Sequence, residues 1–286
     1  MAILFTLRKG IVSVAIKVRL FIGMWLFISI LGLSMIIPSA GYSELTADQI
    51  VEKSEDVYPG MDQQSKLTFT IREPDGGERK VVLRRYWKNY PTDPNVDSKV
   101  LVFHEYPPDT TGTSFMVWTY KTSKHKPEDL WIYLPILRKV QKLPEHPDEI
   151  FSGSNLKPAD MIPRDISLDK HNLLREETIE NQQYYVIEST PKESNRNYNY
   201  SKVVKWINKD NFLKERLDYY STDGTLQKTQ LITWKQVKTA YVWEKVVITN
   251  AKTGVQTMLS ISDVEIDTGL NDKIFSERTM NTGKVK

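Results

Sequence analysis

The amino-acid sequence predicts a mainly β, α+β fold in which an antiparallel sheet packs against helices on a single face. Most segments after residue 60 alternate apolar and polar residues with the period of two that is typical of strands. Turns rich in Asn, Asp and Gly separate the later segments, as in NKDN, DG and KTG. The sequence offers no crossover helix between these segments, so each strand should pair antiparallel with the next.

One helix is expected before the strands, over residues 46–58. Thr46 is the predicted N-cap, and Gln49 three residues later completes a capping box. Pro59 and Gly60 should end the helix. Its apolar positions form one stripe, which should pack on a partner surface. They are Ala47, Ile50, Val51, Val57 and Tyr58.

The strands begin with a hairpin, in which residues 66–72 and 81–87 flank the turn sequence EPDGGERK. Further strands are expected over residues 99–103, 114–120, 129–135, 138–143, 183–190, 201–207, 212–221, 226–237, 241–249 and 255–266. An insertion, residues 144–176, interrupts this rhythm and carries two short helical candidates, residues 155–161 and 167–174. With the N-terminal helix, the insertion is expected to cover one face of the sheet.

The first 43 residues have the composition of a targeting segment. Four basic residues and no acidic ones precede an apolar run of 18 residues, 20–37, and small residues follow it. We expect a signal peptide over residues 1–43, cleaved after Gly41 or Ser43. The run also reaches the lower limit for a membrane span, so an uncleaved anchor is the alternative. Residues 44–286 should form a single domain in the periplasm.

Charge and cysteine content exclude several classes of site. The chain has 39 Lys and Arg against 36 Asp and Glu, and removing residues 1–43 leaves 35 against 36, a net charge of about −1. Domains that bind nucleic acid usually carry a strong basic excess, so no nucleic-acid partner is expected. The chain has no Cys, which excludes disulfides, thiolate metal sites and a lipidated N-terminal cysteine.

The sequence gives no positive case for catalysis. Acidic pairs such as Glu176 with Glu177 are expected by chance in a chain with 26% charged residues. GxSxG elbows and Gly-rich phosphate loops are missing. No zinc motif connects the four histidines, and surface or loop positions are the simplest interpretation of them: His104, His125, His146 and His171. We therefore expect that the protein is not an enzyme and binds neither a metal nor a cofactor.

The predicted strands are rich in aromatic residues. Ordinary β-propensity explains part of this. The functional interpretation is that one sheet face forms a packed core while the other lines an apolar concave site. The segment DLWIYLPILRKVQKLP, residues 129–144, raises the same question. A buried strand, a membrane-surface loop or the wall of a lipid-binding cavity would each explain it.

Three segments in order resemble the LolA-like outer-membrane lipoprotein-sorting proteins, in the branch associated with RND-type transporters. These segments are PPDTTGTSFMVWTY, DLWIYLPILRKVQKLP and FSGSNLKPADM. The residues that carry the resemblance are Gly112 and Thr113, Trp131 to Pro135 with Arg138 and Lys139, Phe151 to Ser154, and Asp160. At lower specificity the resemblance extends over most of residues 45–280.

The resemblance implies a strongly curved antiparallel sheet, an incomplete barrel whose concave apolar face is covered by helices. It implies a periplasmic carrier that binds lipid or lipoprotein acyl chains without catalysis. The carrier would pass them between an inner-membrane transporter, of RND or ABC type, and an outer-membrane acceptor. A lipid-sensing or lipoprotein-sensing regulatory module and an envelope lipid hydrolase are the alternatives.

The resemblance also makes residues 129–144 a wall strand of the half-barrel, with Arg138 and Lys139 at its exposed turn. Because strand residues alternate, Trp131 and Tyr133 share one face and Ile132 shares the other with Leu134. We expect the aromatic pair to line the ligand, since Trp and Tyr suit a partly wet boundary. The full set of expected cavity-wall residues is Phe115, Val117, Trp118, Trp131, Tyr133, Trp234 and Trp243.

Cleavage of the leader predicts a defined mature mass. Protein from a periplasmic extract should begin at Tyr42 or Glu44 and should stay in solution without detergent, because the apolar run would be gone. Intact-mass spectrometry checks this. A full-length species that requires detergent would instead identify residues 20–37 as an anchor.

Overall fold

The computed structural model describes residues 44–124, 126–143, 154–156, 160, 164–193 and 198–285. The predicted leader, residues 1–43, and part of the predicted helix at 155–161 lie outside these residues. The described chain forms one sheet of 13 strands, paired antiparallel throughout, with two short α-helices. The prediction of a mainly β fold with an antiparallel sheet is therefore confirmed.

Strands make up most of the described chain. They are β1 (Asp62–Arg72), β2 (Glu78–Asn89), β3 (Val96–Tyr106), β4 (Ser114–Tyr120), β5 (Asp129–Leu134), β6 (Lys139–Leu143), β7 (Asp169–Ile179), β8 (Gln182–Pro191), β9 (Lys202–Asn208), β10 (Lys214–Tyr220), β11 (Leu226–Val237), β12 (Ala240–Asn250) and β13 (Gln256–Ile266). The α-helices are α1 (Ala47–Glu55) and α2 (Glu277–Thr282). Each predicted strand overlaps an observed one.

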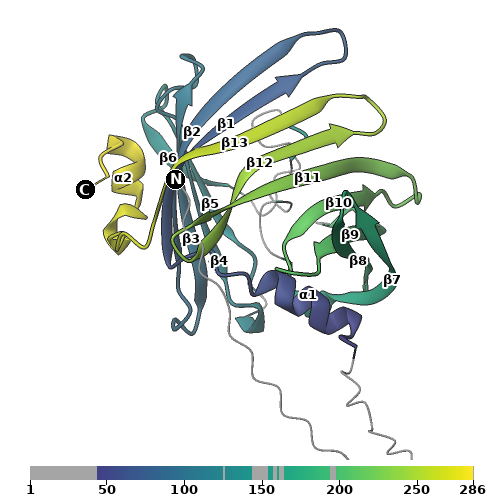
Figure 1. The fold of residues 1–286 in the computed structure, drawn as a ribbon. Coiled ribbons are helices and arrows are strands. Elements are labelled where there is room, and N and C mark those ends of the chain that lie inside the picture. The colour runs from purple at the N-terminus through teal and green to yellow at the C-terminus, as the bar shows by residue number, and fades with distance from the viewer. Residues whose placement is uncertain are drawn as a thin grey trace, which may run out of the picture. The chain divides into compact units, whose positions relative to one another are not determined.

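The strand order is that of two meanders joined at one seam. It runs β6-β5-β4-β3-β2-β1-β13-β12-β11-β10-β9-β8-β7, so every neighbouring pair except β1–β13 is consecutive in sequence, and the insertion connects the two end strands, β6 and β7. The seam pairs Leu67 with Ile261 and Phe69 with Leu259. Figure 1 shows β1 and β13 side by side, with β3–β6 on one side of the seam and β7–β10 on the other.

One predicted helix is wrong. Residues 167–174 were expected to be helical, but a short 3-10 helix, Ile166–Leu168, leads directly into strand β7. β7 pairs with β8 along its whole length and forms one end of the sheet. The leucines of this segment fit a helical spacing in isolation, but the pairing with β8 decides the backbone conformation.

Helix α1 begins as predicted and ends earlier. The Thr46 side chain accepts a hydrogen bond from the Gln49 backbone N–H at 3.2 Å, and the Gln49 side chain accepts one from the Thr46 N–H at 2.9 Å. The helix ends at Glu55 rather than near residue 58. Its fully buried Ile50 and Val51 pack with Ile187 and Ile207 of strands β8 and β9.

The C-terminal segment packs on the opposite face of the sheet, at the strands β2–β5. The sequence predicts no helix there. Ile274, Phe275 and Met280 are almost fully buried in a second cluster, whose sheet residues are Tyr86, Leu101, Met116 and Tyr133. Figure 1 shows α2 beside the β3–β6 strands and α1 beside β7–β9.

The two faces of the sheet are named here after one residue each. The Phe69 face carries Leu67, Phe69, Leu83 and Val102, with α1 packed on it at β8 and β9. The Tyr133 face carries Leu101, Met116 and Tyr133, with α2 packed on it. Because side chains alternate along each strand, the register assigns every strand residue to one of these faces.

Asp62 binds the segment that follows β13. Its buried carboxylate accepts hydrogen bonds from the backbone N–H groups of Thr268, Gly269 and Leu270 at 2.8–3.0 Å and from the Thr268 hydroxyl at 2.9 Å. Burial raises the pKa of Asp62, but these hydrogen bonds outweigh burial and hold it below the ordinary carboxyl value. The clamp links the start of β1 to the segment that leads into α2.

None of the helices within the described residues is both long and apolar enough to span a bilayer.

Replacing Asp62 by Asn should destabilise the fold. The Asn side chain keeps one acceptor oxygen, but its NH₂ group then faces backbone N–H groups that need an acceptor. This should lower the free energy of unfolding by roughly 1–3 kcal/mol. Because the folded pKa lies below the unfolded one, the carboxylate stabilises the protein above the unfolded pKa, and this is lost as pH falls through the folded pKa. The gap between wild type and Asp62→Asn should therefore shrink in acid.

Urea unfolding at pH 7 and pH 3 measures this. Asp75→Asn is the matched control, since Asp75 lies in an exposed turn and accepts one hydrogen bond, from Gly77 at 3.0 Å. That change should stay within about 0.5 kcal/mol. Equal midpoints for Asp62→Asn and wild type at pH 7 would show that the clamp does not stabilise the fold.

Candidate functional site

The Phe69 face carries the largest cluster of buried apolar residues in the described chain. Its core residues come from strands on both sides of the seam and share one cluster: Leu67, Phe69, Leu83, Val102, Val203, Leu217, Tyr219, Ile232, Val246, Ile248, Leu259 and Ile261. Toward β2–β5 the apolar residues of the same face are only half-buried, namely Trp87, Val100, Phe115, Val117 and Ile132. Apolar surface on this face therefore remains accessible at one end.

The described part of the insertion covers the other end of this face. Leu156 is fully buried in the cluster, and Asn155 binds β13 through its N–H to the Thr257 hydroxyl at 3.1 Å. The Tyr200 ring meets Tyr198 at 5.2 Å and Tyr219 at 4.9 Å between ring centroids. Residues 154–156 therefore pack on the same face as α1, whereas α2 packs on the Tyr133 face, so the described helices do not lie on a single face as expected.

The seven predicted cavity-wall residues lie on both faces of the sheet. Those on the Phe69 face are Phe115, Val117, Trp234 and Trp243. Those on the Tyr133 face are Trp118, Trp131 and Tyr133. Phe115, Val117 and Trp118 lie on one strand, and the period of two prevents all three from sharing a face. The structure thus brings together two groups rather than a single wall.

The tryptophans on the Tyr133 face form a packed pair. Trp118 and Trp131 meet edge to face at 5.4 Å, and the Lys99 ammonium lies 4.3 Å from the centre of the Trp118 ring. Lys99 also pairs with Asp272 at 3.0 Å, which ties this cluster to the C-terminal segment. Tyr133 is 8% exposed and lines a groove of about 270 Å³ beside α2. Ligand contact by Trp131 and Tyr133 stays a prediction.

The turn between β5 and β6 presents apolar side chains to solvent. Ile136 is 90% exposed and Leu137 is 54% exposed, and Arg138 and Lys139 follow them. Arg138 adopts the left-handed conformation, with φ of 49°. The basic pair therefore stands at an exposed turn, and the apolar pair stands beside it.

A buried ion pair lies on the Phe69 face. Lys228 of β11 contacts the carboxylate of Asp160, and their side chains are 4% and 1% exposed. The Tyr200 hydroxyl donates to Asp160 at 2.8 Å. Burial, followed by the charge of Asp160, raises the pKa of Tyr200, and burial also raises that of Tyr219. Both tyrosines stay neutral, so the group acts as a satisfied network that holds the insertion.

A second polar group lies on the same face near the seam, and the sequence predicts none of it. Ser65 of β1 stands directly opposite Arg85 of β2, and His104 of β3 lies on the same face. Four buried side-chain atoms have no hydrogen-bond partner in the described part of the chain, and three of them belong to this group: Ser65 Oγ, Arg85 Nε and His104 Nε2, the fourth being Trp118 Nε1 on the other face. The signal that could reveal this group is the RR pair in VVLRRYW, because consecutive strand residues face opposite sides.

Burial controls the charge states of this group. It lowers the pKa of Arg85 to about 10, so the guanidinium remains a cation at neutral pH. It also lowers the pKa of His104, which is therefore neutral. Farther along the Phe69 face, burial and then the charge of Lys214 lower the pKa of Lys205 to about 8. Cations thus stand on an otherwise apolar face.

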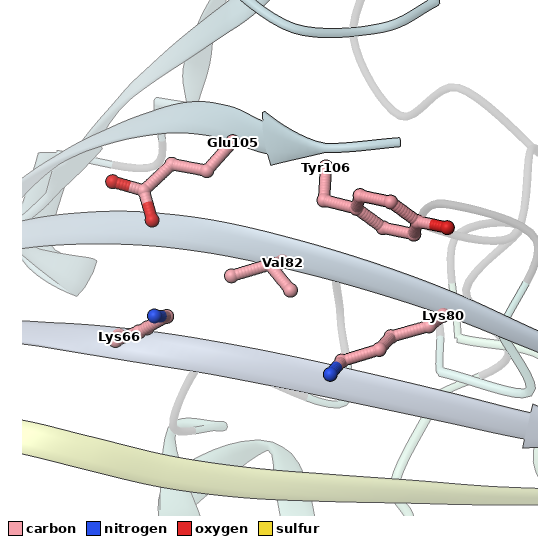
Figure 2. A pocket seen from close by; sticks show the side chains of 5 residues that line it. All are labelled: Lys66, Lys80, Val82, Glu105 and Tyr106. Carbon is pink, nitrogen blue, oxygen red and sulfur yellow. The ribbon is translucent and has the colours of Figure 1, made fainter. Parts of the chain in front are cut away.

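A groove of about 480 Å³ opens on the Tyr133 face, away from α2. Figure 2 shows its lining: Lys66 from β1, Lys80 and Val82 from β2, and Glu105 and Tyr106 from β3. Glu105 is already paired with Arg84 at 2.6 Å. The groove is lined by two lysines and by a carboxylate that already has a partner. Its lining residues include no nucleophile with an adjacent base, so they do not form a catalytic site.

The histidines that the structure describes do not gather at one site. His104 is buried in β3, so its interpretation as a surface or loop residue is wrong, and its ring lies 5.6 Å from that of Phe115. His171 of β7 is half-buried and contacts the Ser189 hydroxyl at 2.8 Å. Within the described ranges, no three His, Asp or Glu side chains are grouped as metal ligands. His125 and His146 lie outside the described residues.

One protein family, described as an uncharacterized protein family, matches residues 96–282. The chain belongs to this family. Among curated proteins no sequence matches the chain. The family match includes β3–β13 and α2, and therefore most of both sheet faces.

Three solved structures have similar folds, each at 24% sequence identity and each covering 82% of this chain. A DUF1329 family protein from Desulfovibrio piger has a TM-score of 0.74 over 97% of its own chain. A domain from Vibrio parahaemolyticus, whose name assigns it to outer membrane lipoprotein sorting, has 0.72 over 98%. A LolA superfamily protein from Nitrosomonas europaea has 0.60 over 99%. The chain has the LolA-like fold.

Replacing Lys228 by Met should destabilise the protein by about 3–5 kcal/mol, because it leaves the Asp160 carboxylate buried without its cation. The double variant Lys228→Met, Asp160→Asn should recover most of this loss. Chemical unfolding measures both. Arg72→Met is the control, since its pair with Glu78 is exposed and worth less than about 1 kcal/mol. A double variant as unstable as Lys228→Met would contradict a role through the charge pair.

Proposed function

We propose that this protein is a periplasmic carrier that binds an acyl chain of a lipid or lipoprotein on the Phe69 face of its sheet. The observation that carries the proposal is the half-buried apolar end of this face, at β2–β5, on a LolA-like fold. These residues lie side by side on neighbouring strands, and a contiguous, partly exposed apolar surface of this kind marks a binding site more often than scattered single residues do. The names of similar proteins, which refer to the LolA superfamily and to lipoprotein sorting, support the same class of cargo.

An apolar face suits this task because acyl chains offer little besides apolar area. Each methylene removed from water contributes roughly 0.8 kcal/mol, so a long chain binds without any catalytic group. The aromatic side chains on this face supply large area with few rotatable bonds. Phe115, Trp234 and Trp243 are the candidates to contact the chain directly.

In this proposal the sheet curves into an incomplete barrel, with the Phe69 face inside. The bent course of the strands in Figure 1 supports this shape. So does the position of α1 and of residues 154–156, which pack on that same face. A cleaved leader would place the protein in the periplasm, where an inner-membrane transporter of RND or ABC type supplies cargo and an outer-membrane acceptor receives it.

The turn between β5 and β6 fits a carrier that must approach a membrane or a membrane protein. Ile136 and Leu137 are exposed, and the basic Arg138 and Lys139 stand next to them. An apolar tip beside positive charge is favourable at an anionic lipid surface. The proposal therefore assigns binding to the Phe69 face and delivery to this turn.

The proposal predicts opposite effects for two neighbouring residues of β4. Phe115 lies half-buried on the Phe69 face, whereas Met116 is 2% exposed on the Tyr133 face. Phe115→Ala should weaken a fluorescent C12 acyl probe about tenfold, because it removes apolar contact area, with a small change in stability. Met116→Ala should cost about 2–5 kcal/mol of stability and leave probe affinity within about twofold.

Fluorescence titration and urea unfolding of both variants decide between the faces. If Met116→Ala folds and loses the probe while Phe115→Ala binds normally, the ligand lies on the Tyr133 face, where Trp131 and Tyr133 were predicted to line it. If wild-type protein does not bind the probe, the carrier proposal fails.

A further inference from the structure

Arg85 is a buried cation without an anion. Its guanidinium donates a hydrogen bond from Nη2 to the Gln63 side-chain oxygen at 2.6 Å. Within the described residues no carboxylate pairs with it, and its Nε has no partner at all. The residue as a whole keeps some accessible surface, so a ligand has a route to it.

The neighbours of Arg85 add further unsatisfied atoms. Ser65 stands opposite Arg85 across the β1–β2 pair, and cross-strand partners have Cβ atoms about 5 Å apart. His104 is a diagonal neighbour on the same face, since Arg85 pairs with Val102 two residues earlier in β3. Ser65 Oγ and His104 Nε2 also lack partners. Three neighbouring strands thus hold, on one face, a guanidinium Nε–H, a hydroxyl and an imidazole nitrogen without hydrogen-bond partners among the described residues.

Three other buried charges in the described chain have partners. Lys228 has Asp160, Arg164 pairs with the buried Asp169 at 2.8 Å, and Asp62 accepts four hydrogen bonds. Buried polar groups without partners are rare and unfavourable, so three on neighbouring positions require an explanation. A ligand group that completes their hydrogen bonds provides one.

We propose that Arg85, with Ser65 and His104, forms a recognition site for the anionic headgroup of an amphiphile whose chain lies on the Phe69 face. This rests on the proposed function and narrows its substrate class. The chemistry that fits the two donors, Arg85 and Ser65, is a carboxylate or a phosphate, and a phosphate that keeps one proton also donates to His104 Nε2. Either group accepts from the Arg85 Nε–H and the Ser65 hydroxyl, and Arg suits such planar or tetrahedral oxyanions.

The geometry supports an anion held at a fixed depth. Gln63 accepts from the Arg85 Nη2 and itself donates to the Pro59 carbonyl, so the far end of the guanidinium is anchored and the Nε edge is left for the ligand. The Thr110 hydroxyl donates to the Pro107 carbonyl at 3.1 Å and so accepts from His104 Nδ1 at 3.3 Å, which leaves Nε2 as an acceptor. A protonated phosphate or a lipid hydroxyl could donate to it.

Apolar residues next to this group continue toward the accessible end of the face. Leu83 and Val102 flank Arg85 and His104, and the Phe115 ring lies tilted against the His104 ring, with 5.6 Å between centroids. A chain attached to the headgroup would therefore run from Arg85 across β3 and β4 toward Ile132. An amide-linked or ester-linked acyl chain of a lipoprotein offers no charge at this position, so the site favours an anionic lipid over a lipoprotein as cargo.

Competition with three ligands of equal chain length tests the inference. The experiment measures how well each ligand displaces a neutral fluorescent acyl probe from the full chain. The ligands are dodecanoic acid, dodecyl phosphate and dodecanol. Wild type should prefer at least one of the two anions to dodecanol by about tenfold or more, the ratio that one charge-assisted hydrogen bond provides. Which anion is preferred identifies the carboxylate or the phosphate as the headgroup.

Arg85→Met should remove this preference while leaving dodecanol affinity unchanged. Arg84→Met is the matched control, because Arg84 is the neighbouring residue, faces the other side and pairs with Glu105. It should keep the preference. Arg85→Met should also unfold at an equal or higher urea concentration than wild type, since it removes an unpaired buried cation; a purely structural arginine would give the opposite result.

The outcomes separate this inference from the proposed function. If no ligand displaces the probe, or the probe does not bind, the carrier proposal fails. If all three ligands compete equally in wild type, the carrier proposal stands and the headgroup site is wrong. The headgroup site is also wrong if Lys205→Met abolishes the preference and Arg85→Met does not. Should Arg85→Met fail to fold, Ser65→Ala and Arg85→Lys carry the same test, and an unchanged preference in both would overturn the site.

Discussion

The pairing of β1 with β13 is the constraint on which the two faces of this sheet depend. It is the one junction between two runs of strands, and it brings the start of the domain against its last strand. The register sets Leu67 against Ile261 and Phe69 against Leu259, so apolar residues from both runs meet on one face. A slip of one residue would turn the core side chains of β1 to the other side. Asp62 holds this junction at its end.

Local signals explain why most strands are predictable and why this junction is not. Hairpins such as β1–β2 are encoded by a turn sequence and by alternation within about twenty residues. The partner of β1 lies nearly two hundred residues away, and nothing in either strand alone identifies the other. β7 shows the same limit, because Leu173 and Leu174 fit a helical spacing until β8 provides backbone partners. The C-terminal helix is short, and its Phe275 and Met280 are explained only by the surface they cover.

The candidate site, too, is predictable in its local features and unpredictable where distant parts of the chain meet. Alternation correctly predicts that Trp131 and Tyr133 share a face opposite Ile132, since the register confirms it. It does not predict which face is accessible, because that depends on where α2 and the insertion pack. Aromatic content also draws attention away from polar residues in apolar strands. Arg85 lies in a segment that looks like an ordinary strand, and only the structure reveals that no carboxylate among the described residues pairs with its guanidinium.

Lys228 and Arg85 show two ways in which one face can hold a buried cation. Lys228 is matched by Asp160 within the chain, so it serves the packing of the insertion and needs no ligand. Arg85 is not matched, and its pairing is left to whatever occupies the face. The apolar residues around it contribute binding energy in proportion to chain length, at roughly 0.8 kcal/mol for each methylene, whatever the headgroup. Chain burial alone therefore cannot separate two lipids of equal length, whereas one cation at a fixed depth can, because a neutral headgroup leaves it unpaired. A single polar contact also adds little to the work of releasing a long chain, so a carrier of this design would gain selectivity for its cargo while keeping that cargo transferable.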